Sequence, residues 1–171
     1  MTYPFSYCPA CGERAPTFAD GKQLQCALCG LQYFHNVAAA VGVFIRHRQH
    51  VLLAERGREP GQGMLDLPGG FVEPGESLEQ GLQREISEEL GIELSRPSYL
   101  FSFANNYRYE GVLYRTVDAM FEVVVAQRPH VVAADDVSAL TWVRLSDVNL
   151  SDLAFDSVKA AVTTLRQPNR S

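Results

Sequence analysis

Apolar residues group into short runs along most of the chain, and these runs have the length of β-strands. Five runs are bounded by polar or turn-forming residues, as expected for strands that pack into a core. The predicted strands cover residues 37–45, 51–54, 99–104, 117–126 and 140–145. Only a short polar stretch separates the first two runs, so we expect them to pair as antiparallel strands.

A different period begins after residue 77, where every fourth position is apolar. The repeating positions are Leu78, Leu82, Ile86 and Leu90. Residues spaced in this way share one face of an α-helix. Ser77 and Gln80 have the spacing of a capping box, and Gly91 stands where a helix-terminating glycine belongs. We therefore predict a helix over 78–90.

A second helix is predicted over 158–165, opened near Asp152 or Asp156, where the chain becomes amphipathic again. Strands and helices alternate, but without strict strand–helix–strand repetition. This order predicts an α/β fold in which helices cover both faces of a mixed sheet.

The helix over 78–90 also carries three carboxylates along the edge of its apolar face. On a helical wheel, Glu89 falls inside the apolar arc, Glu85 borders it, and Glu88 lies further out. Like charges four residues apart destabilise a helix unless a positive group offsets them, and burial increases the cost. Two explanations are open from the wheel alone: a Mg²⁺ site built from carboxylate oxygens, or an ion-pair network with Arg84.

The wider spacing around these acids resembles a family motif. Gly70 is followed after five residues by Glu76, and after seven more by the segment 84–92, in the order R-E-I-S-E-E-L-G-I. This matches G-x5-E-x7-R-E-U-x-E-E-x-G-U, where U is aliphatic, and it resembles the Nudix hydrolases. The resemblance implies an α/β/α sandwich whose loop-helix-loop binds Mg²⁺ or Mn²⁺.

The resemblance also implies roles for the residues of the motif. It assigns magnesium binding to Gly69, Gly70, Glu85, Glu88 and Glu89. Glu85 and Glu89 would be the principal ligands, and Glu88 would bind directly or through water. Glu76 would be an outer acid, and Arg84 would orient the glutamates.

A further acid from outside the motif is expected in the turn before Trp142. Asp135 and Asp136 lie there, and Asp136 is the catalytic candidate that we name. Glu110 is a second candidate. An ordinary polar turn between two strands explains the acidic pair equally well.

All four cysteines lie within the first 30 residues, in two C-x2-C-G segments separated by fourteen residues. They are Cys8, Cys11, Cys26 and Cys29. This separation is one residue short of the usual range of Zn²⁺ ribbons, and the two C-x2-C-G segments predict such a ribbon, in which the metal supplies the folding energy that a small core lacks. Disulfides or free thiols are the alternative, and they are disfavoured in a reducing compartment. We predict a structural zinc ribbon over 1–34 and a Nudix hydrolase domain over 35–171.

The composition narrows the classes of partner. With 46% hydrophobic and 20% charged residues, the chain has the composition of a soluble globular protein, and we expect it in the cytoplasm without a membrane partner. The net charge is −5, and Lys and Arg do not cluster along the sequence, so we expect no nucleic-acid partner. The expected partners are a small nucleotide substrate and a second copy in a homodimer.

A cysteine ribbon ahead of this motif resembles two subgroups of the family. The NADH pyrophosphatases carry an S-Q-P-W-P-F-P-x-S segment after the motif, which is missing here. Segment 152–158 is similar to a segment of plant proteins associated with FAD and ADP-ribose hydrolysis. We therefore predict hydrolysis of FAD, ADP-ribose or an NADH-like compound to AMP and a second monophosphate. A nucleoside-triphosphate pyrophosphohydrolase and a non-catalytic nucleotide-sensing module are the alternatives.

Overall fold

The computed structural model describes residues 5–14, 17–19 and 22–167. Contacts divide the chain into two compact units. One unit comprises Met1–Val37 with Asn106–Arg115, and the other comprises Ala38–Asn105 with Thr116–Ser171. The predicted ribbon boundary at residue 34 stays a prediction.

The smaller unit contains a three-stranded antiparallel sheet. Its strands are β1 (Thr17–Ala19), β2 (Gln23–Gln25) and β3 (Gln32–Phe34), and their order in the sheet is β1–β2–β3. Each strand has only three residues, so none shows a hydrophobic period, and the sequence did not predict them.

The larger unit is built on a six-stranded sheet. Its strands are β4 (Ala38–His47), β5 (His50–Arg56), β6 (Leu65–Asp66), β7 (Ser98–Tyr109), β8 (Val112–Val124) and β9 (Val137–Arg144). The order is β6–β5–β4–β8–β7, and β9 also pairs with β5. β4 runs parallel to β8, whereas β5 is antiparallel to β4, β6 and β9. The predictions of a mixed sheet and of an antiparallel first pair are confirmed.

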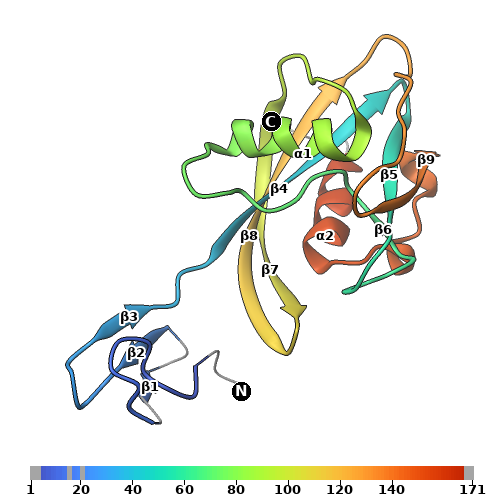
Figure 1. The fold of residues 1–171 in the computed structure, drawn as a ribbon. Coiled ribbons are helices and arrows are strands. Elements are labelled where there is room, and N and C mark those ends of the chain that lie inside the picture. The colour runs from blue at the N-terminus through green and yellow to red at the C-terminus, as the bar shows by residue number, and fades with distance from the viewer. Residues whose placement is uncertain (1–4, 15–16, 20–21, 168–171) are drawn as a thin grey trace. The chain divides into compact units, whose positions relative to one another are not determined.

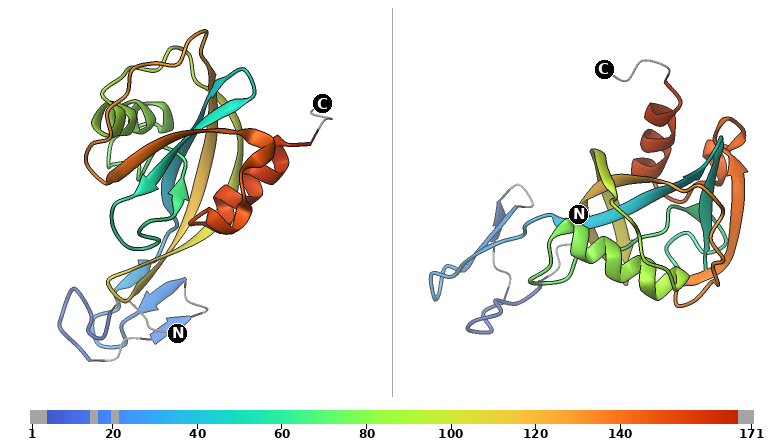
Figure 2. Two further views of the ribbon diagram at one scale, coloured as in Figure 1. Left: turned by 90° about the vertical axis from the view of Figure 1, so that its right-hand side faces the viewer. Right: turned by 90° about the horizontal axis from the view of Figure 1, so that it is seen from above.

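Two helices cover opposite faces of this sheet, as Figures 1 and 2 show: α1 (Leu78–Leu90) and α2 (Asp156–Leu165). Leu82 and Ile86 of α1 pack with Val43 of β4 in one core. Val162 of α2 packs with Phe44 of β4 in the other. Because neighbouring residues of β4 point to opposite faces, one strand contributes to both cores. The predicted α/β/α arrangement is therefore confirmed.

The boundaries of α1 follow from its capping residues. The hydroxyl of Ser77 accepts from the backbone N–H of Gln80, whose side chain accepts in return from the N–H of Ser77. Gly91 ends the helix in the left-handed region, at φ 67°, and its N–H donates to the carbonyl of Ser87. The predicted helix over 78–90 is confirmed at both ends.

The ends of other elements differ from the predictions. β7 and β8 extend through polar residues to a tight turn at Glu110 and Gly111, well beyond the apolar runs that predicted them. α2 begins at Asp156, one of the two predicted openings, whereas Asp152 ends the 3-10 helix η2 (Leu150–Asp152). A second short turn of this kind is η1 (Leu145–Asp147). Within the described residues, no helix is long and apolar enough to cross a membrane.

Candidate active site and zinc centre

A glycine turn holds the loop before α1 against β4. The N–H of Val41 donates to the carbonyl of Gly70 at 2.9 Å, and the N–H of Val43 donates to Pro68 at 3.0 Å. Gly69 has φ 139°, and a Cβ there would lie 2.1 Å from the carbonyl oxygen of Val41. Only glycine fits this position, so the turn fixes the loop beside the middle of β4.

The carboxylate of Glu89 is buried under this turn. It accepts from the N–H of Gly69 at 2.9 Å, and the residue is 8% exposed. Burial raises the pKa of Glu89 to about 8; the Gly69 bond opposes this rise, and the negative charges of Glu85, Asp66 and Asp135 add to it. A buried carboxylate with other acids around it is a site that a cation stabilises.

The carboxylate of Glu85 lies against the second glycine of the turn. A Cβ on Gly70 would come within 2.5 Å of an oxygen of Glu85, so the glycine makes room for the acid. Burial raises the pKa of Glu85, and the neighbouring Arg84 opposes that rise. A side chain at position 70 would therefore displace the carboxylate of Glu85.

Arg84 links the other acids of the motif. Its Nε and Nη2 atoms donate to the two oxygens of Glu76 at 2.8 and 3.0 Å. Its Nη1 atom donates to Glu85 at 2.9 Å and to Glu88 at 3.1 Å. The hydrogen bonds from Arg84 lower the pKa of Glu76. The ion-pair network considered from the sequence is thus present, and Glu89 accepts from the glycine turn instead.

The predicted magnesium ligands are neighbours but do not form a closed cluster. Among the described residues, the one group of three or more acidic, His or Cys ligand atoms that lie within 4.8 Å of one another is the cysteine set. Arg84 holds oxygens of Glu85 and Glu88, and Glu89 approaches from the buried side. Hard oxygen donors with excess negative charge fit a divalent cation such as Mg²⁺.

The loop that precedes β9 brings an acid from outside the motif to this site. The N–H of Ala134 donates to the backbone carbonyl of Glu89 at 3.1 Å, and the N–H of Gly57 donates to the carbonyl of Asp136 at 2.7 Å. Asp135 lies between these anchors at φ 51°, which is unusual for a residue other than glycine. Its negative charge adds to the rise in the pKa of Glu89, after burial and the charges of Glu85 and Asp66.

Asp136, the candidate named from the sequence, is placed differently from Asp135. Its side chain is ion-paired with Arg58, which also lies 3.6 Å from Asp135. Glu110, the second candidate, lies in the β7–β8 turn, which belongs to the smaller unit.

The sequence analysis missed two acids of the sheet, of which Asp118 is buried and is bound to α2. Asp118 accepts from the hydroxyls of Thr116 and Ser157 at 2.5 and 2.6 Å. Asp66 is ion-paired with Arg56 at 3.0 Å, and burial raises its pKa to about 6. An aspartate inside the apolar run over 117–126 was the available signal for Asp118.

Ser157 also clarifies the late segment 152–158. Its side chain is 1% exposed and reaches β8, and the N-cap of α2 is Phe155, which makes no side-chain capping bond. Ser157 therefore binds Asp118 of the sheet and does not cap α2.

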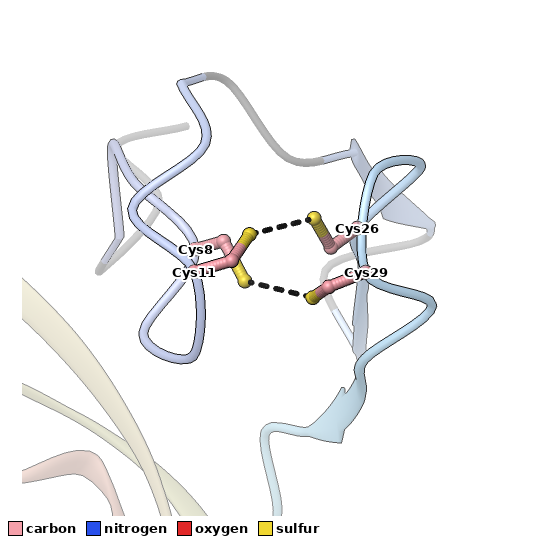
Figure 3. Close-up of side chains that lie close together, drawn as sticks. All are labelled: Cys8, Cys11, Cys26 and Cys29. Atoms are coloured by element: carbon pink, nitrogen blue, oxygen red, sulfur yellow. Dashed lines mark hydrogen bonds between the residues drawn. The ribbon is translucent and has the colours of Figure 1, made fainter.

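The four cysteines meet in the smaller unit, as Figure 3 shows. The sulfurs of Cys8 and Cys29 are 3.7 Å apart, and those of Cys11 and Cys26 are 3.6 Å apart. A tetrahedral zinc with Zn–S bonds of about 2.3 Å separates its sulfurs by roughly 3.8 Å, whereas a disulfide needs about 2.05 Å. All four cysteines are free, so the set fits a zinc site and excludes disulfides in this structure.

The model of the NUDIX domain matches residues 36–163, three quarters of the chain. The chain belongs to the NUDIX domain family. Its motif residues are therefore those of a Nudix domain, and the predicted family is confirmed.

Individual Nudix proteins show how far the similarity extends. The NAD-capped RNA hydrolase NudC of Vibrio vulnificus is 37% identical over 102 residues, which cover 60% of this chain and 39% of that protein. This chain thus spans well under half the length of that relative. The NUDIX domain of Shewanella oneidensis NrtR, solved with ADP ribose, is 27% identical, with a TM-score of 0.63 over 78% of this chain and 90% of the other. A NUDIX hydrolase from Nitrosomonas europaea shares the fold at a TM-score of 0.66, with 20% identity over 98% of this chain and 97% of the other.

Proposed function

We propose that the chain is a Nudix pyrophosphohydrolase that cleaves the diphosphate of an ADP-linked nucleotide such as ADP-ribose, FAD or an NADH-like compound. The observation that carries this proposal is the buried Glu89, surrounded by further acids beneath the glycine turn. Arg84 offsets only part of the negative charge of this site, which therefore favours a cation that can in turn bind phosphate oxygens. Names of similar proteins mention ADP ribose and NAD-capped RNA, which supports a diphosphate-linked nucleotide.

The motif residues have separate tasks in this proposal. Glu85, Glu88 and Glu89 would hold Mg²⁺ or Mn²⁺, together with the backbone of Gly69 and Gly70. The bound cation would shield the charge of the diphosphate and lower the pKa of a water molecule. Arg84 fixes the carboxylates of Glu85 and Glu88, and Glu76 holds Arg84 in place with two hydrogen bonds. A site ordered before substrate binds reduces the cost of reaching the transition state.

Asp135 completes the proposed site as the acid from outside the motif. Its charge acts on Glu85 and Glu89, and two backbone hydrogen bonds hold the residues on either side of it. Both Asp135 and Asp136 lie within ion-pair distance of Arg58, and we assign the proton-accepting role to Asp135 because its charge acts on Glu85 and Glu89. The cysteine ribbon would hold a structural zinc, since four thiolates leave no open position on the metal.

Replacing each of the two neighbouring aspartates by asparagine tests this assignment. We expect Asp135→Asn to lower kcat about a hundredfold, because a positioned general base contributes about 10² to 10⁴ in rate. Asp136→Asn is the matched control and should stay within tenfold of the unaltered protein. Steady-state kinetics with ADP-ribose measure both. A larger loss in the Asp136 variant than in the Asp135 variant would reverse the assignment.

Product analysis tests the proposed reaction. The magnesium-loaded chain is incubated with ADP-ribose, FAD, NADH and nucleoside triphosphates, and the products are separated by chromatography. We expect AMP from ADP-ribose and from FAD, with ribose 5-phosphate and FMN as the second products, and the highest kcat/KM for one of these dinucleotide-like compounds. Pyrophosphate from nucleoside triphosphates, with no AMP from any of the other substrates, would replace this function by that of a triphosphate pyrophosphohydrolase.

A further inference from the structure

The ends of several strands bring together arginines that are far apart in the sequence. Four segments lie at the same end of the sheet, where its strands begin or end: residues 46–50, 94–98, 124–132 and 142–146. They contain five arginines, three histidines and no aspartate or glutamate. Since the whole chain has a net charge of −5 and these segments contribute +5, the remaining residues carry −10. Positive charge is therefore concentrated in these segments, and the rest of the chain is strongly acidic.

The strand register shows why these segments are close. Arg46 at the end of β4 lies beside Val124 at the end of the parallel β8. His50, at the start of β5, pairs with His47 of β4 on one side and with Arg144 of β9 on the other. Figure 1 shows that the two parallel strands β4 and β8 finish at the same end of the sheet. We call Arg48, Arg96, Arg128, Arg144, His47 and His50 the basic edge.

Part of the basic edge lies on the face of the sheet that α1 covers. Leu52 packs in the core beneath α1, and its partner in the register is Trp142. The guanidinium of Arg128 lies over the ring of Trp142, 5.1 Å from its centre. Arg144 is two residues beyond Trp142 on the same strand, and such residues point to the same side. Arg128 and Arg144 therefore lie on the face of the sheet that α1 covers.

Of the three acids that flank these segments, one is already paired with an arginine outside the basic edge. Glu122 is bound to Arg46 at 2.5 Å, and it alternates with Phe121 and Val123 of the α1-side core, so it points to the α2 face. Glu93 and Asp147 are the other flanking acids. Charges more than about 8 Å away are largely screened at physiological salt, so the acidic remainder of the chain weakens the edge little.

The shape of the basic edge fits an extended polyanion better than a single phosphate. It spans the ends of five neighbouring strands, or roughly 19 Å at about 4.8 Å per strand spacing. Its four arginines are exposed. An aromatic ring accompanies them, because Tyr99 near the start of β7 is 55% exposed and packs edge-on against Phe121. Spaced cations with an exposed aromatic ring are the features that bind single-stranded nucleic acid.

The basic edge is also connected to the candidate active site. β9 starts at Val137, directly after the loop that carries Asp135, and ends at Arg144. This strand spans roughly 23 Å at 3.3 Å per residue. A chain of nucleotides attached to the hydrolysed nucleotide would have a binding surface at that distance.

We propose that the basic edge binds single-stranded RNA. RNA binding at the basic edge does not depend on the proposed function. The proposal departs from the expectation of no nucleic-acid partner, which rested on the net charge of −5 and on the lack of clustering along the sequence. Here the sheet, and not the sequence, places the cations together.

A charge-removal variant tests RNA binding without hydrolysis. The probe is a short fluorescein-labelled oligoadenylate with an unmodified 5′-hydroxyl, which has no diphosphate to cleave, and its binding is followed by fluorescence anisotropy. We expect Arg96→Gln, Arg128→Gln and Arg144→Gln together to weaken binding at least tenfold at low salt. The slope of log K against log salt should become shallower by about 2, since each phosphate contact on a single strand contributes about 0.7.

A matched variant carries the same charge change elsewhere: Lys22→Gln, Arg115→Gln and Lys159→Gln. We expect it to bind RNA as the unaltered chain does, and we expect both triple variants to hydrolyse ADP-ribose within twofold of that chain. Tyr99→Leu should weaken RNA binding several-fold without changing the salt slope, because it removes stacking but no charge.

Three results would overturn the proposal: no RNA binding by the unaltered chain, equal losses in the two triple variants, or inorganic polyphosphate binding as tightly as RNA with no effect of Tyr99→Leu. Absence of ADP-ribose hydrolysis by a chain that still binds RNA at the edge would contradict only the proposed function.

Discussion

Replacing Glu89 by glutamine is expected to lower magnesium-dependent hydrolysis on the order of a thousandfold. The change removes a charge but almost no volume, and the loss of a few kcal/mol of transition-state stabilisation corresponds to a factor of about 10³. The fold should remain, because burial already disfavours the charged form of this side chain and raises its pKa to about 8. Steady-state kinetics at saturating Mg²⁺, with thermal unfolding of the same samples, measure both effects.

A control on the same helix separates the site from the helix. Glu79→Gln makes the same chemical change at an exposed position in the first turn of α1. Its activity should match that of the unaltered chain. If Glu89→Gln retained activity within tenfold of Glu79→Gln, the assignment of Glu89 as a metal ligand would be wrong.

Removing zinc is expected to unfold the cysteine-containing segment while the six-stranded sheet remains folded. A structural zinc contributes about 10 to 16 kcal/mol of binding free energy in small zinc domains, and the three-residue strands here offer little to replace it. Elemental analysis should find one zinc per chain. Cys26→Ser should lose that zinc and make the segment before residue 35 sensitive to limited proteolysis.

Leu28→Ser is the matched control for the cysteine variant. Leu28 lies between Cys26 and Cys29, and its side chain is 69% exposed, so the change should leave the zinc content and the protease resistance unaltered. A zinc-free purified chain with four cysteines that react rapidly with a thiol reagent would contradict the ribbon.

Local signals were sufficient for the elements that position the motif. α1 was predicted at both ends because its capping box, its fourfold apolar period and Gly91 agree within one short segment. β4 was recognised because a strand covered on both faces reads as a continuous apolar run. The roles of the acids were implied by the spacing of the family motif, and their contacts came only from the structure.

Contacts between distant segments were not visible in the sequence. Asp118 and Ser157 are 39 positions apart, and their hydrogen bond depends on how α2 docks on the sheet. The short strand β6 exists because two residues pair with β5, which no period can reveal. The preference for Asp135 over Asp136 likewise depends on the fold, because it rests on the charge that Asp135 exerts on Glu85 and Glu89 of the distant helix α1.

Because two backbone hydrogen bonds hold the residues beside Asp135, the loop before it can change in sequence while this aspartate stays in place. Ala134 is fastened to the last turn of α1, and Asp136 is fastened to Gly57, so the position of Asp135 is set at its immediate neighbours. Insertions or substitutions over 126–132 would change the surface of the loop without moving this aspartate. Natural variants of this domain could therefore acquire different macromolecular partners there while keeping the same chemistry.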